Sequence, residues 1–156
     1  MTSHAVIAIA LACMVFAGLI YYEAVEAGAP GSTQPDRGHD KCATECSNCQ
    51  RACEACAHHC AHLLEQGKKE HHHTLRTCQD CAAICGVAAS IVARKGPFSD
   101  SICQACIEVC SRCAKECEKY SQDKEMKQCA EECRRCEQAC RDMVATITGK
   151  KTEGRK

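Results

Sequence analysis

The sequence predicts an all-α protein: an antiparallel, up-down-up-down four-helix bundle with a Cys-lined core, preceded by an N-terminal signal or anchor helix. Three observations lead to this fold class. Cysteines recur at alternating steps of three and four residues, which is the spacing of the buried seam on a bundle helix. Four such segments follow one another along the chain. The connections between them are short, so successive helices must be antiparallel neighbours.

The first element is an apolar stretch near the N-terminus. Residues 5–22 contain no charged side chain, and acidic and small residues follow them. A stretch of this length suits the hydrophobic region of a signal peptide or a short membrane helix. We therefore assign residues 1–27 to a signal peptide or membrane anchor. We expect the protein to be exported, either periplasmic (extracytoplasmic) or membrane-anchored and facing outside, and to contact a membrane only through this segment if it is uncleaved.

The first two helices of the bundle follow a linker. Residues 28–39 contain Gly, Pro, Ser and Thr without periodicity, which is typical of a linker. The bundle, residues 40–149, begins after it near Asp40. We expect Gly67 to stop the first helix, because glycine readily adopts the backbone conformation that ends helices. The second helix should end before Gly96-Pro97, since proline cannot continue a helix.

The last two helices begin at capping residues. We expect Ser99 to cap the third helix and Ser121 or Asp123 to cap the fourth, because their side-chain oxygens can accept a hydrogen bond from the backbone of the first turn. The fourth helix should end at Gly149. Residues 150–156 are mostly charged and form a tail.

Eighteen of the nineteen cysteines lie in these four helices, on one face of each. A single cysteine on a helix seam is usually a small core residue, but an unbroken row of them packs less apolar volume than leucines would. A disulfide scaffold would show irregular Cys spacing and more Gly and Pro. The regular spacing instead predicts metal ligands. These are Cys42, Cys46, Cys49, Cys53, Cys56, Cys60, Cys78, Cys81, Cys85, Cys103, Cys106, Cys110, Cys113, Cys117, Cys129, Cys133, Cys136 and Cys140.

The spacing of the thiols also indicates which metal they bind. Side chains four residues apart on a helix have Cβ atoms about 5–6 Å apart, and metal–sulfur bonds are roughly 2.3 Å long. Two such thiolates can hold one ion between them, which suits Cu(I), the ion that Cys and Met ligands select. Zn(II) would need four thiolates from facing helices, and nothing in the continuous row marks off sets of four. We therefore expect multiple Cu(I) ions.

Antiparallel packing gathers histidines and one methionine at one pole of the bundle and apolar side chains at the other. At the first pole we expect His71 and Met126 to bind metal, because both continue the cysteine row. Copper should therefore enter at this pole. Two other histidines, His58 and His62, point away from the cysteine row and should be solvated. The opposite pole should be plugged by Ile91, Val92, Ile102, Met143, Val144 and Ile147.

Composition limits the other functions. The formal net charge is zero and 3% of the residues are aromatic, so we expect no nucleic-acid partner. We find no catalytic constellation and expect a binding protein, not an enzyme. Two alternatives stay open: a thiolate buffer for Zn(II) or another soft metal, and a thiol or Fe–S redox protein. For the second, the ferredoxin motif is missing, because no cysteine here is followed by proline.

Two segments show the repeated spacing in full: Cys42-Ala-Thr-Glu-Cys46-Ser-Asn-Cys49 and Cys129-Ala-Glu-Glu-Cys133-Arg-Arg-Cys136. With these steps the chain resembles the bacterial copper storage proteins, Cys-rich four-helix bundles, from about Asp40 to Ile147. The resemblance implies that thiolate-bound Cu(I) fills the bundle core and enters at the His- and Met-bearing end. It also implies a homo-oligomer, commonly a tetramer.

Overall fold

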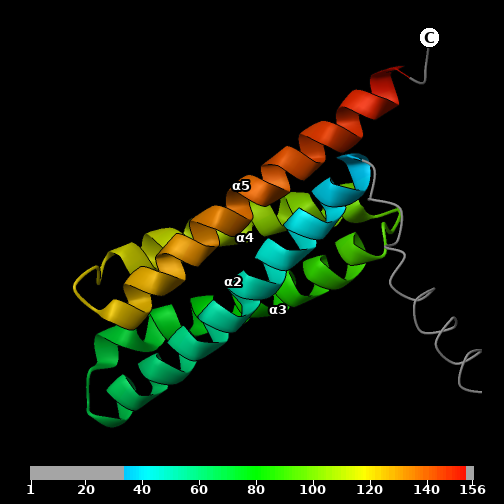
Figure 1. Ribbon diagram of the computed structural model, residues 1–156. Coiled ribbons are helices and arrows are strands. Elements are labelled where there is room, and N and C mark those ends of the chain that lie inside the picture. The colour runs from blue at the N-terminus through cyan, green and yellow to red at the C-terminus, as the bar shows by residue number, and fades with distance from the viewer. Residues whose placement is uncertain (1–33, 154–156) are drawn as a thin grey trace, which may run out of the picture. The chain divides into compact units, whose positions relative to one another are not determined.

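The computed structural model describes residues 34–153 of the 156-residue chain (Figure 1). The prediction of an N-terminal signal or anchor helix falls on residues 1–27, outside this range. The described residues form helices and turns and contain no strand. Their elements are α2 (Gln34–Glu65), the 3₁₀ helix η1 (Lys69–His71), α3 (His72–Ala93), α4 (Ser99–Glu118) and α5 (Lys124–Glu153).

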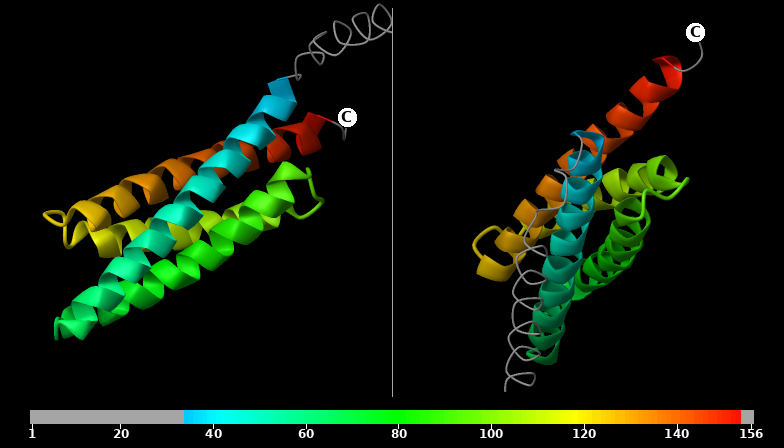
Figure 2. Two further views of the ribbon diagram at one scale, coloured as in Figure 1. Left: turned by 60° about the horizontal axis from the view of Figure 1, so that its bottom comes forward. Right: turned by 45° about the vertical axis from the view of Figure 1, so that its right-hand side comes forward.

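The four α-helices form an antiparallel bundle. Figures 1 and 2 show the chain running along α2, back along α3, forward along α4 and back along α5. Each helix packs against two neighbours, since α2 contacts α3 and α5, and α4 contacts α3 and α5. Diagonal pairs make no such contact within the described residues. The helices therefore surround one shared core, as the cysteine spacing predicts.

The end of α2 confirms the predicted role of Gly67. This residue has a φ of 84°, a left-handed conformation that costs glycine little. The N–H of Gly67 donates to the Leu64 carbonyl at 2.9 Å, and the N–H of Lys68 donates to the Leu63 carbonyl at 3.0 Å. This pair of bonds is the Schellman motif, which satisfies the last carbonyls of a helix. The chain then turns through η1 into α3.

The turn between α3 and α4 agrees with the prediction at the end of α3 and differs from it at the start of α4. α3 ends at Ala93, before Gly96-Pro97, and Lys95 in the turn takes a left-handed conformation, with a φ of 54°. Ser99 is the first residue of α4 and makes no cap bond to it. Its hydroxyl instead donates to the Gly96 carbonyl at 2.7 Å, because a nearby free carbonyl competes with the cap for a serine side chain. At α5 the prediction holds: Asp123 Oδ1 accepts the N–H of Met126 at 3.1 Å.

The first and last helices are longer than expected. α2 begins at Gln34 and so takes in residues 34–39, which the sequence assigned to the linker. Proline is tolerated in a first turn, whose N–H groups have no helical partner, and Gly38 packs towards Met143 of α5. α5 continues through Gly149 to Glu153. A glycine inside a helix costs only about 1 kcal/mol, and the lysines after it are good helix formers.

The core consists mostly of sulfur and methyl groups. The eighteen described cysteines are each at most 1% exposed, and they form one buried cluster with alanines and with Met126, Met143, Val92 and Leu63. Small side chains let the helices approach closely: a Cβ on Gly86 of α3 would lie 2.9 Å from the Gln50 amide oxygen of α2. Ion pairs such as Arg134 with Glu118 lie on the outside.

One described helix passes a simple test for membrane spans. The segment Lys69–Ala93 is long enough and has a mean hydropathy of 1.2 over its most apolar window. The core helix of a bundle passes the same test, and the Cys side of α3 is buried against the other helices. The finding is therefore weak support for a membrane role.

Candidate metal centre

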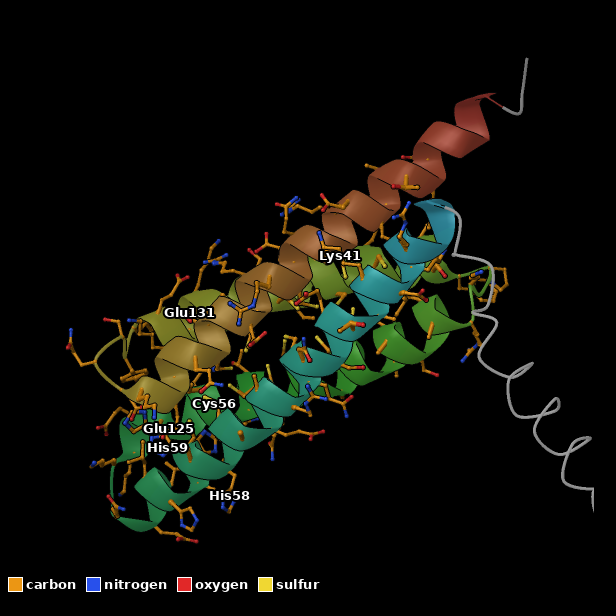
Figure 3. All side chains as sticks on the ribbon, viewed as in Figure 1. Lys41, Cys56, His58, His59, Glu125 and Glu131 are labelled. Atoms are coloured by element: carbon orange, nitrogen blue, oxygen red, sulfur yellow. The ribbon has the colours of Figure 1, made fainter. Side chains whose placement is uncertain are left out.

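The thiols of the described bundle are free and lie in contact with one another. None of the eighteen forms a disulfide. Their sulfur atoms approach to between 3.5 Å, for Cys85 and Cys110, and 4.0 Å, for Cys42 and Cys103. Figure 3 shows the sulfur atoms gathered between the helices. The spacing of cysteines along each helix thus produces one continuous volume of sulfur.

Most of these contacts join different helices. Cys53 of α2, for example, has its Sγ 3.6 Å from that of Cys133 on α5 and 3.9 Å from that of Cys113 on α4. Three contacts join residues four apart in one helix: Cys49 with Cys53, Cys81 with Cys85, and Cys106 with Cys110. The sequence analysis emphasised such pairs within a helix, but the structure places the nearest sulfurs mainly across the core.

The contacts group the thiols into sets of four. In each set all four sulfurs lie within 4.8 Å of one another and come from three or four helices. The expectation that nothing marks off fours was therefore wrong, because it considered each helix alone. Several cysteines belong to two sets, so the sets are not independent sites. They include Cys46/Cys106/Cys136/Cys140, Cys49/Cys53/Cys81/Cys133, Cys49/Cys85/Cys110/Cys136, Cys53/Cys113/Cys129/Cys133 and Cys56/Cys78/Cys117/Cys129.

Shared cysteines favour bridging thiolates. Isolated tetrahedral Zn(II) sites, each with four thiolates of its own, could not occupy all these sets at once. Cys49, for instance, belongs to two sets, and its sulfur lies within 3.9 Å of those of Cys53, Cys110 and Cys133. A soft ion with fewer ligands can use each sulfur together with a neighbouring ion. The arrangement thus suits a multinuclear Cu(I) thiolate core.

The metal-free core holds protons that a metal must displace. Hydrogen bonds with neighbouring thiols, Cys113 foremost, together with burial raise the pKa of Cys53 and of Cys78 above the ordinary thiol value. The pKa of Cys60 is raised by its hydrogen bond with Cys56 and then by burial. In contrast, the hydrogen bonds of Cys49 with Cys110 and Cys133 lower the pKa of Cys49. The metal-free core therefore contains both thiols that hold their protons and thiols that favour the thiolate.

One pole of the bundle, which we call the mouth, is formed by the end of α2, the start of α3, the end of α4 and the start of α5. His71 lies here, 7% exposed, and its Nδ1 is buried without a hydrogen-bond partner. Its ring packs against that of Tyr120 at an interplanar angle of 49°, with centroids 4.4 Å apart. Both residues line a cavity of about 350 Å³ that Leu63 and Asp123 also border. An unpartnered imidazole nitrogen beside a cavity is available to an ion.

Met126 also lies at the mouth. It is fully buried and belongs to the same cluster as the thiols. Asp123 fixes the start of its helix and also accepts a bond from His59 Nε2 at 2.7 Å. Although burial acts to raise the pKa of Asp123, the bonds from His59 and the Met126 N–H hold it below its usual value. This ion pair ties α2 to α5 beside the mouth.

Two mouth residues were missed by the sequence analysis. Glu116 is 7% exposed and accepts a bond from Thr74 Oγ1 at 3.2 Å. It also pairs with Lys119. No spacing rule distinguishes it from the solvated glutamates. Tyr120 could have been found, since it lies three residues after Cys117 and so continues the cysteine row; its hydroxyl donates to the Glu70 carbonyl at 3.2 Å.

The other histidines of residues 34–153 lie outside the core. His58 and His62 are exposed on α2, as expected, and Figure 3 shows His58 on the outer side of this helix. His72 and His73 are exposed at the start of α3, and His73 Nε2 lies 3.6 Å from Glu116 Oε2. Of the mouth histidines, His71 is thus the one that is buried.

The opposite pole, which we call the plug, is mostly as expected. Val92 is fully buried and Met143 is 2% exposed. Ile102, Val144 and Ile147 are partly buried against the core. Ile91 lies outside the core cluster, because its side chain is directed towards the turn at Gly96. The plug therefore forms without Ile91.

Comparisons with known proteins agree with this geometry. A family model described as copper storage protein matches residues 36–145. A comparison with curated proteins finds no match. Among solved structures, a cytosolic copper storage protein from Streptomyces lividans, with five coppers, is 32% identical over 71% of this chain and 95% of that chain, with a TM-score of 0.62. Another structure from that organism is loaded with 10 copper equivalents.

Two further structures are similar. A Cu(I)-bound copper storage protein, BsCsp3, is 31% identical over 66% of this chain and 94% of that chain, with a TM-score of 0.61. A protein from Nitrosospira multiformis is 35% identical over 71% of this chain and 98% of that chain, also with a TM-score of 0.61. In each case the solved chain is covered almost completely.

The S. lividans protein contradicts the localisation expected from the sequence. That relative is cytosolic, whereas the apolar residues 5–22 led us to expect an exported or membrane-anchored protein. The expectation rested on the length and hydropathy of one segment, which lies outside the described residues. The thiols argue against it, because cysteines form disulfides in oxidising compartments and stay reduced in the cytosol.

The raised thiol pKa values predict proton release on metal loading. Thiols such as Cys53, Cys60 and Cys78 hold their protons at neutral pH, and a metal binds only the thiolate. Adding Cu(I) to the reduced protein should therefore release about one proton for each such thiol bound, and lowering the pH should weaken binding. A pH indicator in dilute buffer measures the release. Protein with alkylated thiols is the control, and equal release from both would contradict the prediction.

Proposed function

This chain belongs to the copper storage protein family, and we propose that its eighteen buried cysteines are the ligands that hold the copper. The protein stores copper as Cu(I) bound by thiolates. The observation that carries the assignment of ligands is the set of shared four-thiol groups, in which every sulfur is buried. We assign no catalytic residue to this chain.

The number of ions follows from charge. If each thiolate bridges two ions and each ion binds two thiolates, a neutral core holds about one Cu(I) per cysteine. A neutral cluster avoids the large cost of burying net charge. The second candidate function, a Zn(II) buffer, finds support in the sets of four, because Zn(II) binds four thiolates in a tetrahedron. The sets share cysteines, however, so only some of them could be filled by Zn(II) ions that share no sulfur.

Copper enters at the mouth and the plug stays closed. In support, the mouth has the buried, unpartnered His71 Nδ1, the buried Met126 thioether and an adjoining cavity. These soft or borderline ligands can take an ion from solution and pass it to the first thiols. The plug has Val92, Met143 and partly buried aliphatic side chains, among which a desolvated ion would have few ligands.

The protein works in a reducing environment as a homo-oligomer. The first statement is supported by the free thiols at contact distance and by the cytosolic relative in S. lividans. The second statement, that the protein is a homo-oligomer and specifically a tetramer, is supported by the family resemblance. Val87 and Phe98 are 49% and 68% exposed, and an interface between copies would bury such side chains.

Capacity tests the ligand assignment. We expect reduced protein to take up about eighteen Cu(I) per chain, because every described cysteine joins the core. Anaerobic titration against a coloured Cu(I) chelator gives the number. Saturation at four or five ions would instead mean isolated tetrahedral clusters, and saturation that did not change after cysteine substitution would place the copper elsewhere.

Rates test the mouth. Replacing both of its ligands, His71→Leu with Met126→Leu, should slow copper uptake by about tenfold, equivalent to about 1.4 kcal/mol on the barrier. Capacity should stay nearly unchanged, because the thiols are intact. Stopped-flow transfer from a Cu(I) chelator measures the rate.

Two variants control this experiment. His72→Leu with Met143→Leu removes the same residue types, one exposed and one at the plug, and should leave the rate as in the unaltered protein. Cys85→Ser with Cys110→Ser removes two sulfurs 3.5 Å apart and should lower capacity by two or more ions with little effect on the initial rate. An unchanged rate in the mouth variant would show that copper enters elsewhere.

A further inference from the structure

A second group of potential metal ligands lies outside the thiol core. His58 and His62 are one turn apart on the exposed side of α2, and Figure 3 shows His58 pointing away from the bundle. Their Nε2 atoms are 3.1 Å apart. The ring centroids are 4.5 Å apart and the ring planes are inclined by 78°. Two imidazole nitrogens therefore lie next to each other at the surface of the bundle.

The distance between these nitrogens is that of two ligands on one ion. Imidazole nitrogens bind Zn(II) at about 2.0–2.1 Å, so two of them in adjacent coordination positions are roughly 2.9–3.4 Å apart. The observed 3.1 Å lies within this range. Without an ion, one of the two Nε2 atoms carries a proton and donates a hydrogen bond to the other. Moving that proton to Nδ1 of the same ring frees both Nε2 lone pairs, with no net release of protons.

Glu65 prepares one of the two rings. Its Oε2 lies 3.1 Å from His62 Nδ1. The carboxylate accepts a hydrogen bond from the Nδ1–H of His62. Nε2 of the same ring then carries no proton, and its lone pair is directed towards His58. A carboxylate bound to the distal nitrogen in this way orients metal-binding histidines and increases their basicity. His59, in contrast, is directed to Asp123 and takes no part.

We propose that His58 and His62 form a surface site for one borderline divalent cation, of which Zn(II) is the example tested below. Imidazole nitrogen suits such ions, whereas the thiol core suits soft Cu(I). Water completes the coordination, so the ion exchanges directly with solvent. The chain thus binds two classes of metal at separate places, in the core and on the outer face of α2 near the mouth.

The test uses full-length protein that has first been loaded with Cu(I) to capacity without oxygen, so that the thiols are occupied. Equilibrium dialysis against zinc sulfate, followed by metal analysis, counts bound Zn(II) and retained copper. We expect His58→Ala with His62→Ala to bind one Zn(II) fewer per chain than the unaltered protein. Glu65→Ala should keep the number and lower the affinity several-fold.

The matched control removes another pair of exposed histidines. His72→Ala with His73→Ala also deletes two exposed imidazoles, but adjacent residues on a helix do not face each other. This variant should bind Zn(II) as the unaltered protein does. Equal Zn(II) binding by the His58/His62 variant and the unaltered protein would overturn the proposal. So would Zn(II) uptake matched by loss of copper, since the zinc would then lie in the core.

Discussion

Contact between sulfur atoms on different helices is the constraint on which the rest of this structure depends. Sulfurs can approach to 3.5–4.0 Å across the bundle only if four helices pack closely around them. Small side chains make this possible, because the neighbours of the thiols in the core include buried Ala43, Ala57, Ala88 and Ala114. Such a core buries less apolar area than one of leucines. Metal–thiolate bonds supply stability that the side chains alone do not.

Antiparallel connection gives the two poles of the core different chemistry. The α2–α3 and α4–α5 hairpins place their turns at the mouth, where His71, Tyr120 and Asp123 meet beside a cavity. The remaining ends meet at the plug, where Val92 and Met143 are buried. A store that was open at both ends would exchange metal through both poles. Under the proposal that ions enter at the mouth, the rate of exchange and the capacity depend on different residues.

The cysteine spacing was sufficient to predict the bundle and the buried face of each helix, and the glycine at position 67 predicted the end of the first of them. It could not predict which sulfurs touch, because a heptad pattern fixes the face of a helix but not its axial position against a neighbour. The sets of four therefore had to come from the structure. Glu116 was missed for a related reason, since its buried side chain bonds to Thr74 of the neighbouring helix α3, and this contact depends on how the two helices are aligned. The expected export failed because one apolar stretch does not determine a compartment.

The central claim is that copper is held between helices by shared thiolates. Anomalous diffraction at the copper absorption edge, from crystals of the fully Cu(I)-loaded protein, tests it most directly. The account predicts a row of copper sites along the bundle axis, most of them bound by sulfurs from at least two helices, with individual sulfurs bridging neighbouring ions. Copper found in separate four-thiolate sites that share no sulfur, or bound outside the bundle, would contradict it.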